Sequence, residues 1–489
     1  MPEIATRDGE LWSTDAHAAR AAVGRRLDVY GSFQAIMGQL TGGVFLTGYA
    51  LALHAGNELI GLLAALPLAI KLTQLYTSWH IERAGHWKRS ALRAAALSRG
   101  ALLLAAGIPF AVASGSLASW LLVVIVAVSA FAGSIFDLAF LTWMAELIPA
   151  SVRGAFLGQR SRVTGLVGQA VALAAAFGLD RWRQSHANAP DAFAILFGAG
   201  AVLGLIGLTF LGGVPVPRRK VSRVEEPSIV STLTGPARDP NVRRLLEFVA
   251  VWHFSIGLVG PFFTVFMLQQ LGLSFALVMA FSVVTNLTGS LTQAYWGKLG
   301  DHFGSKTALR AGTYLITFVV GLWLIVTPHR VWPIVLIQLI SGFGWSAYNA
   351  NLSNLVLKLA PEGHMPSYIA SLGAVSGSAE AIGPIVGGVA LTALRGTGVP
   401  AIDAFYALFA TSLVLRAIAT ILPGFVREPG GAPVGHMVRV MARFRTMNID
   451  MPFEPIFSYA FTHVARIADF IARERTDPPT RGRPAWASR

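Results

Sequence analysis

The sequence predicts an all-α integral membrane protein whose twelve transmembrane helices form two pseudo-symmetric six-helix bundles. Three observations predict this fold class: an apolar composition, a series of hydrophobic runs of membrane-spanning length, and an internal repeat. Of the 489 residues, 54% are hydrophobic and 13% are charged, and the mean hydropathy is +0.57. Because a soluble protein usually carries about 25% charged residues, lipid is expected to surround most of this chain.

The hydrophobic runs have the length of about 20 residues that a helix needs to cross a bilayer. Brief polar segments separate them. Since the number of spans is even, both chain ends are expected on one side of the membrane. We predict the spans at residues 27–53, 58–79, 91–113, 119–147, 155–178, 191–213, 243–269, 273–297, 309–327, 332–357, 367–394 and 401–425.

Alternate loops differ strongly in basic charge, which predicts the orientation. The segment 214–242 carries Arg218, Arg219 and Lys220, whereas the loops of the opposite side carry few basic residues. Because basic loops resist export, this segment and both termini are predicted to be cytoplasmic, in a cytoplasmic (inner) membrane. The net charge of +14 then follows from topology, so nucleic acid is not expected as a partner.

An internal repeat divides the membrane region into two halves. Residues 72–76 return as 291–295, residues 25–27 return as 243–245, and residues 147–149 match 359–361, all in the same order. Parallel repeats of this kind build transporters whose substrate site lies near the bilayer midplane. The predicted organisation is a cytoplasmic segment 1–26, a bundle 27–213, a cytoplasmic linker 214–242, a bundle 243–425, and a cytoplasmic tail 426–489.

A polar signature follows the second span of each half. Residues 297–306 read GKLGDHFGSK, and residues 78–89 at the matching place read SWHIERAGHWKR. Both copies resemble the major facilitator superfamily signature G-x-L-A-D-R-x-G-R-R, and the second copy is the better match. Glycine permits close helix approach, and a carboxylate can accept bonds from a helix N-terminus.

The resemblance implies a twelve-helix transporter fold in which Asp301 and Glu82 latch the two halves in one conformation. Glu146 and Arg153, between the fourth and fifth spans, resemble a charge pair at the cytoplasmic gate, although an ordinary positive-inside loop explains them equally well. The complete set of predicted gating residues is Glu82, Arg83, Gly85, Gly297, Asp301, Gly304, Lys306, Glu146 and Arg153.

Residues 383–388 in the eleventh span read GPIVGG. This run resembles a motif that lies in the fifth span of antiporters of the superfamily. Such a run allows close helix packing and a bend in the helix. An antiport mechanism does not follow from it, because the fifth span here lacks the run.

Ionisable residues far from the membrane surface are costly and therefore mark functional candidates. Lys71 and Asp137 each lie about nine residues, roughly 13 Å at 1.5 Å per residue, from the predicted cytoplasmic ends of their spans, so they could pair. Glu380 lies deeper, in the eleventh span, and could bind a proton. The structural alternatives are an ion pair for the first two residues and a hydrogen-bonded packing residue for Glu380.

Neutral polar and aromatic residues within spans could line a solute cavity, although helix packing explains each of them as well. The main candidates are Gln34, Gln39, Asn286, Asn349 and Trp345, and the further candidates are Asn351, Asn354, Tyr30, Trp252, Phe262, Phe263 and Tyr348.

The tail carries apolar residues at helical spacing near 455–475, with His463, Arg466, Arg473 and Arg475 interspersed. This pattern predicts an amphipathic helix that lies on the anionic cytoplasmic leaflet or docks a protein partner. The last residues, rich in proline and arginine, are predicted to be disordered.

Several function classes are excluded or disfavoured by the sequence. It contains no cysteine, so disulfides and thiolate chemistry are excluded, and it has no P-loop, H-E-x-x-H or G-x-S-x-G motif. Neither a cofactor nor a metal is expected, and the chain is predicted not to be an enzyme. We predict a secondary active transporter that moves a small solute by alternating access, coupled to a proton or solute gradient. The alternatives are a non-transporting scaffold or assembly factor and a lipid flippase.

Overall fold

A computed structural model describes residues 17–71, 87–148, 150–185, 190–214, 233–361, 364–428 and 432–437. In these residues every regular element is helical, apart from an isolated bridge between Thr327 and Arg330. The predicted all-α class is therefore confirmed. Residues 78–86 of the first signature copy and the predicted helix near 455–475 lie outside the described residues.

The N-terminal bundle is built from seven described helices. Their bounds are α1 His17–Thr41, α2 Gly43–Ala52, α3 Asn57–Lys71, α5 Trp87–Ala111, α6 Ser116–Leu147, α7 Ala150–Ser185 and α8 Pro190–Gly212. The span predicted at 27–53 is broken, because Gly43 adopts a φ of +49° and separates α1 from α2. Such a left-handed conformation favours glycine.

The C-terminal bundle begins with a short 3₁₀ turn, η3 (Pro236–Arg238). Its longer helices are α10 Pro240–Val265, which continues as the π-helical turn η4 Phe266–Gln270, α11 Phe275–Phe303, α12 Ser305–Trp323, α13 Pro333–Leu359, α14 Met365–Gly396 and α15 Ala401–Ala419, followed by η5 Leu422–Phe425. Side chains cap two starts, since Asp239 accepts from the Asn241 backbone and Ser274 accepts from that of Leu277.

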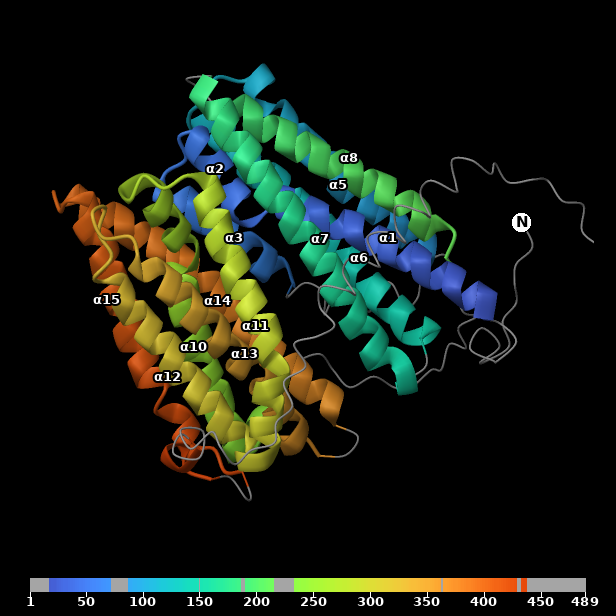
Figure 1. The fold of residues 1–489 in the computed structure, drawn as a ribbon, viewed down its shortest axis with the longest axis vertical. Helices are drawn as coiled ribbons and strands as arrows, with labels where there is room; N and C mark the ends of the chain where they lie inside the picture. The colour runs from blue at the N-terminus through green and yellow to red at the C-terminus, as the bar shows by residue number, and fades with distance from the viewer. Residues whose placement is uncertain are drawn as a thin grey trace, which may run out of the picture.

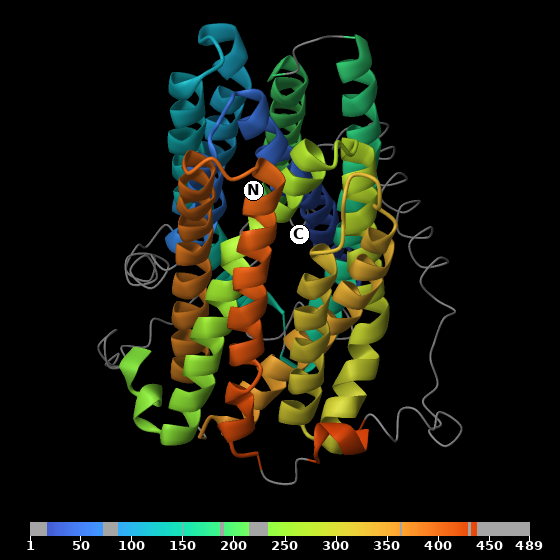
Figure 2. The same cartoon turned by 90° about the vertical axis from the view of Figure 1, so that its left-hand side faces the viewer.

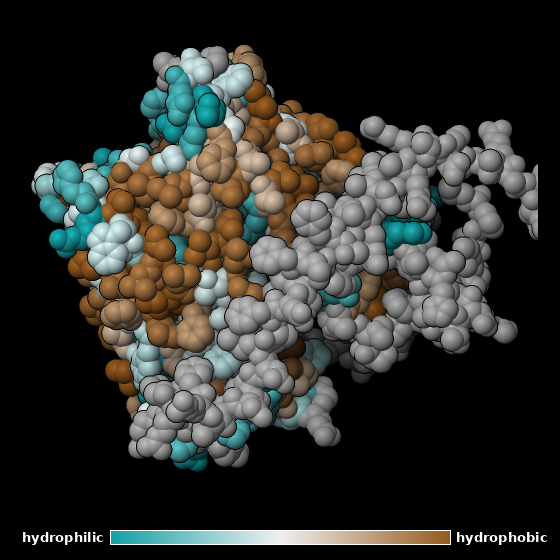
Figure 3. Space-filling view, in the orientation of Figure 1, coloured by the Kyte–Doolittle hydropathy of each residue, from teal (hydrophilic) through white to brown (hydrophobic). Residues whose placement is uncertain are grey.

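Within the described residues, nine helical segments are long and apolar enough to span a membrane. A shorter apolar helix spans residues Asn57–Ile70 of α3. Large apolar side chains point outward, among them Phe110 at 74% and Leu104 at 67% exposure. Figure 3 shows this surface as a broad hydrophobic region with hydrophilic residues gathered toward the ends. Such a surface suits lipid rather than water.

Both bundles run between the same two ends. We call the end at which α8 ends and α10 begins the linker end, and the opposite end the far end. Figure 1 shows α5 to α8 on the upper right and α10 to α15 on the lower left. In Figure 2, the far ends of the N-terminal helices rise above those of the C-terminal helices.

The two halves repeat the same contacts at the linker end. In the first half, Arg26 donates to the carbonyl of Gly213 at 2.9 Å, and Lys88 donates to that of Val214 at 2.7 Å. At the matching positions of the second half, Arg244 donates to Phe425 at 3.1 Å, and Lys306 donates to Val426 at 3.0 Å. In each bundle, two basic side chains thus hold the backbone that follows the last helix.

The bundles contact each other through α3 and α14, α7 and α11, and α2 and α10. At the far end, the carboxylate of Asp180 in α7 accepts the backbone N–H groups of Phe275 and Ala276, at 3.0 and 2.7 Å. The ring of Phe275 also lies 5.5 Å from that of Phe193 and 5.2 Å from the guanidinium of Arg183. Asp180 thus caps a helix of the opposite bundle. We call this the Asp180 contact.

Candidate functional site

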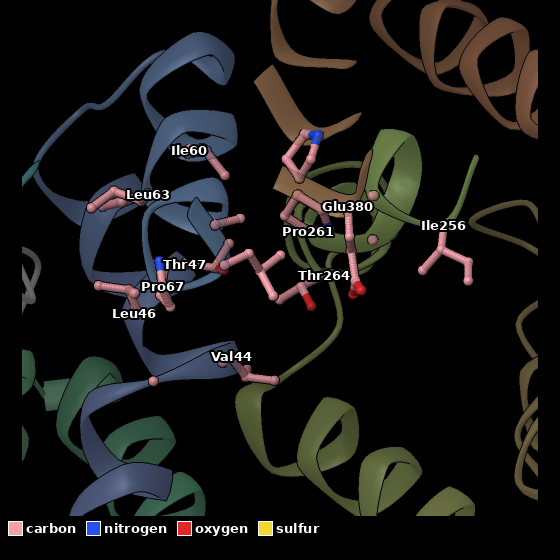
Figure 4. Close-up of a pocket in the computed structure, with 18 residues that line it drawn as sticks. Val44, Leu46, Thr47, Ile60, Leu63, Pro67, Ile256, Pro261, Thr264 and Glu380 are labelled. Atoms are coloured by element: carbon pink, nitrogen blue, oxygen red, sulfur yellow. The ribbon is translucent and has the colours of Figure 1, made fainter. Parts of the chain in front are cut away.

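A cavity of about 420 Å³ lies between the bundles. Helices α2 and α3 form its N-terminal wall, and α10 and α14 form its C-terminal wall, as Figure 4 shows. Its lining is Gly42, Gly43, Val44, Leu46, Thr47, Ala50, Ile60, Leu63, Ala64, Pro67, Leu68, Ile256, Gly257, Gly260, Pro261, Thr264, Glu380 and Pro384.

Glycines let α14 approach both neighbouring helices at this cavity. A Cβ at Gly257 would lie 2.6 Å from the carbonyl oxygen of Glu380, and one at Gly383 would lie 2.6 Å from the amide of Leu258. On the other side of α14, a Cβ at Gly388 would lie 2.5 Å from the carbonyl of Asn57 in α3. The 383–388 run therefore packs α14 against both bundles, which explains its small residues.

Glu380 is the charged residue of the lining. It lies near the middle of α14, about 15 residues or roughly 22 Å of helix from either end. Its Oε2 lies 2.8 Å from Nδ1 of His253 in α10, and their side chains are 31% and 15% exposed, respectively. A half-exposed carboxylate at membrane depth, held by a titratable partner, fits a binding or proton-carrying role.

Tyr348 in α13 extends this pair inward. Its hydroxyl lies 3.0 Å from Nε2 of His253, and the residue is buried. When Glu380 is ionised and the imidazole is neutral, Nδ1–H donates to the carboxylate and Nε2 accepts from the Tyr348 hydroxyl. Doubly protonated imidazole would donate from both nitrogens. Three helices thus hold one imidazole ring between an acid and a hydroxyl. We call these residues the His253 triad.

Aromatic packing holds the buried end of the triad. The ring of Tyr348 stacks on that of Trp252 at 5.6 Å and meets Trp345 edge-on at 5.6 Å. The guanidinium of Arg416, which is 4% exposed in α15, lies 5.8 Å from the Trp252 ring. Of the predicted aromatic candidates, Trp345 and Trp252 therefore support the triad instead of lining the cavity described above.

The N-terminal bundle contains a second polar cluster, centred on Arg99 in α5. Arg99 is 1% exposed, donates to Gln34 Oε1 at 2.5 Å and to the Ala95 carbonyl at 2.9 Å, and lies 5.1 Å from the Phe136 ring. Asp137 interacts electrostatically with this arginine. The side chain of Lys71 lies outside the described residues, so its pairing with Asp137 stays a prediction.

The remaining predicted cavity residues lie elsewhere in the described structure. Asn286 and Asn349 are exposed on α11 and α13, and Gln39 is half-buried in α1. Asn351 is buried and donates to the Trp296 carbonyl at 3.2 Å, which joins α13 to α11. Of the substrate and coupling candidates predicted from the sequence, Glu380 lines the described cavity, and the roles of the others stay predictions.

The second signature copy forms the turn between α11 and α12. Gly304 adopts a φ of +98° there. The carboxylate that caps α12 is Glu428, which accepts from the backbone of Ser305 at 3.0 Å and of Lys306 at 2.7 Å and pairs with Lys358 at 3.0 Å. Asp301 is exposed.

The roles proposed for Asp301 and Gly297 as gating residues stay predictions. Glu82, Arg83 and Gly85, and the side chains of Glu146 and Arg153, lie outside the described residues.

Sequence reasoning did not single out His253, Arg99 or Arg416. Each is an ionisable residue inside a predicted span, so the cost of burying charge was a usable signal. His253 stands in the apolar run of α10, and its partners come from helices 95 and 127 residues further along the chain.

Comparison with known proteins agrees with this architecture. A family model described as the Major Facilitator Superfamily matches residues 245–461. The fold is similar to a mutant of the nucleoside transporter NupG, with a TM-score of 0.66 and 13% identity over 82% of this chain and 99% of that one. It is also similar to a bacterial homologue of the human lysosomal transporter Spinster in an inward-facing and occupied conformation, with a TM-score of 0.62 and 12% identity over 85% of this chain and 97% of that one. No curated protein matches the sequence significantly.

The repeated bundles, the inter-bundle cavity and these matches define a multi-pass membrane transporter. Residues 245–461 match the Major Facilitator Superfamily model, and the fold is similar to that of the two transporters above. These matches agree with the resemblance of the signature residues and support secondary transport.

Proposed function

We propose that this chain is a proton-coupled secondary transporter that carries a small solute through the inter-bundle cavity by alternating access, with the His253 triad as the coupling site. The observation that carries the proposal is the 2.8 Å contact between His253 and Glu380 on the cavity wall. No chemical reaction is assigned to the chain, and neither a cofactor nor nucleic acid takes part.

The far end is the closed end of the pathway in this proposal. Backbone-close packing of α3 on α14 at Gly388 and the Asp180 contact both lie toward that end. The cavity would then open toward the linker end. The positive-inside rule supports a cytoplasmic position for this end in a cytoplasmic membrane, because Arg26, Lys88 and Arg244 gather there.

Coupling follows from the position of the triad at the junction of α10, α13 and α14. Protonation changes the net charge of the Glu380–His253 pair. The free-energy cost of shielding the pair from water therefore changes as well. A proton can shift a two-state equilibrium only if it binds the two states with different affinity. We expect the triad to bind a proton with different affinity in the two states, because its exposure to water changes when α10 and α14 move against α3.

The test uses the absence of cysteine from the sequence, since two introduced cysteines then carry the only spin labels. Ser90→Cys and Pro361→Cys place labels on exposed residues at the linker ends of the two bundles. We expect the distance distribution measured by double electron–electron resonance to shift between pH 5 and pH 8, the range in which histidine usually changes charge. Glu380→Gln should abolish this shift.

The matched control is Glu247→Gln, which removes a carboxylate that is 57% exposed on α10. It should leave the pH-dependent shift intact. If Glu380→Gln and His253→Gln both retain the full shift, the triad is not the coupling site.

The same two spin labels test whether the conformational change depends on the cavity or on the C-terminal tail. We propose that the cavity carries the function and that the predicted helix near 455–475 binds the membrane surface or a protein partner. Removing residues 438–489 should leave the pH-dependent distance change intact. Loss of the change on truncation would assign the conformational switch to the tail.

A further inference from the structure

We infer that the solute of the inter-bundle cavity is a lipophilic organic monocation that competes with a proton for Glu380. This inference rests on the proposed function of the same cavity. It concerns the chemical class of the solute, which neither the family nor the similar structures assign to this chain.

The lining matches an apolar solute body. Most of it consists of aliphatic side chains and glycines, with two hydroxyl groups, from Thr47 and Thr264, on opposite walls. Its volume of about 420 Å³ lies within the range of about 300–1,000 Å³ for small-molecule sites. A sugar-like solute would need many more hydrogen-bonding partners than this wall offers, because unpaired polar groups are costly in an apolar site.

The charge on the cavity wall determines whether a cationic or an anionic solute is favoured. His253 engages Oε2 of Glu380, which leaves Oε1 for a second cationic partner. With a neutral imidazole the pair carries one negative charge, so a monocation is attracted and an anion is repelled. Burial in an apolar surrounding strengthens this discrimination.

Among the described lining residues, Glu380 is the charged one, and other charged residues occur on the elements that pack against α14. Helix α3 carries Glu58 in its first turn. The side chain of Lys71, its last residue, lies outside the described residues. Helix α15 carries Asp403 in its first turn and Arg416, whose guanidinium lies over Trp252. Helices α10 and α13 contribute the triad. Their other charged residues lie toward the linker end, as does Arg238 of η3: Arg243, Arg244 and Glu247 on α10, and Lys358 on α13. A proton on the pair therefore cancels its negative charge and displaces the cation.

Isothermal titration calorimetry on the purified full chain tests the inference with two probes of matched shape and opposite charge, tetraphenylphosphonium and tetraphenylborate. We expect saturable binding of tetraphenylphosphonium at pH 8, with affinity that falls as the pH is lowered. At the lower pH, binding should release a proton, so the observed enthalpy should depend on the ionisation enthalpy of the buffer. Tetraphenylborate should show no saturable binding, and its heats should match those of a titration into protein-free micelles.

Variants identify the carboxylate. Glu380→Gln should weaken tetraphenylphosphonium binding at least tenfold and remove its pH dependence, Glu380→Asp should restore part of both, and Glu247→Gln should match the unmodified chain. Equal binding of the two probes, or unchanged tetraphenylphosphonium binding by Glu380→Gln, would overturn the inference.

The two proposals fail separately. If tetraphenylphosphonium does not bind while the pH-dependent change in label distance still requires Glu380, the solute class is wrong and the coupling site stands. If the probe binds through Glu380 while pH leaves the label distances unchanged, the solute class stands and the coupling proposal is wrong.

Discussion

Replacing Asp180 by alanine should release the far end of the molecule. The carboxylate accepts two backbone N–H groups at the start of α11, at 3.0 and 2.7 Å, and so joins the N-terminal bundle to the C-terminal one. Hydrogen bonds to a charged group contribute about 1.5–3 kcal/mol each when buried. Asp180 is half-exposed, so we expect a combined loss of about 1–3 kcal/mol from the far-end-closed state, or roughly a 5- to 150-fold change in the conformer ratio.

Labels at Ser114→Cys and His329→Cys, both exposed at the far end, measure this change by double electron–electron resonance. The population with a long far-end distance should rise in Asp180→Ala and rise less in Asp180→Asn, whose amide oxygen can still accept one bond. Asp191→Ala removes an exposed carboxylate from the first turn of α8 and serves as the control. An unchanged far-end distribution in Asp180→Ala would refute the assignment of this contact as a closure element.

Three further predictions concern packing and the α11–α12 turn. Gly388→Val should favour far-end opening in the same distance measurement, because its side chain would meet the Asn57 carbonyl that a Cβ already approaches to 2.5 Å; an unchanged distribution would contradict the close packing. Glu428→Ala removes the α12 cap and the Lys358 partner and should lower the thermal unfolding midpoint, with a cost of about 1–2 kcal/mol, whereas Glu247→Ala should leave it unchanged. Gly304→Ala must adopt a φ of +98° and should destabilise the protein by about 1–3 kcal/mol, and an unchanged midpoint would contradict that backbone requirement.

The fold was predictable because lipid imposes simple rules. A segment that crosses the hydrocarbon must satisfy its own backbone and cover it with apolar side chains, so the run at 119–147 became α6, Ser116–Leu147. Some boundaries were less accurate. Helix α7 extends well beyond the predicted 155–178, to Ser185, because a helix can continue past the membrane into water.

The site was predictable in part. Glu380 was marked by the cost of an ionisable group at membrane depth, and the structure places it on the cavity wall. Its partner His253 is 127 residues away in sequence, and local periodicity carries no information about which helices become neighbours. Glu428 was missed for the same reason, since the signature turn it caps lies more than 120 residues earlier.

Accessibility of the cavity from each end tests alternating access most directly. Thr47→Cys and Thr264→Cys, on opposite walls, would each carry the only thiol in the chain, and a membrane-impermeant maleimide would be applied to sealed vesicles of either orientation. We predict that both positions react from the linker-end side, and that reactivity from the far-end side increases when Asp180→Ala is added. Reaction confined to one side in every variant, or no reaction from either side, would contradict a pathway that opens alternately to the two ends.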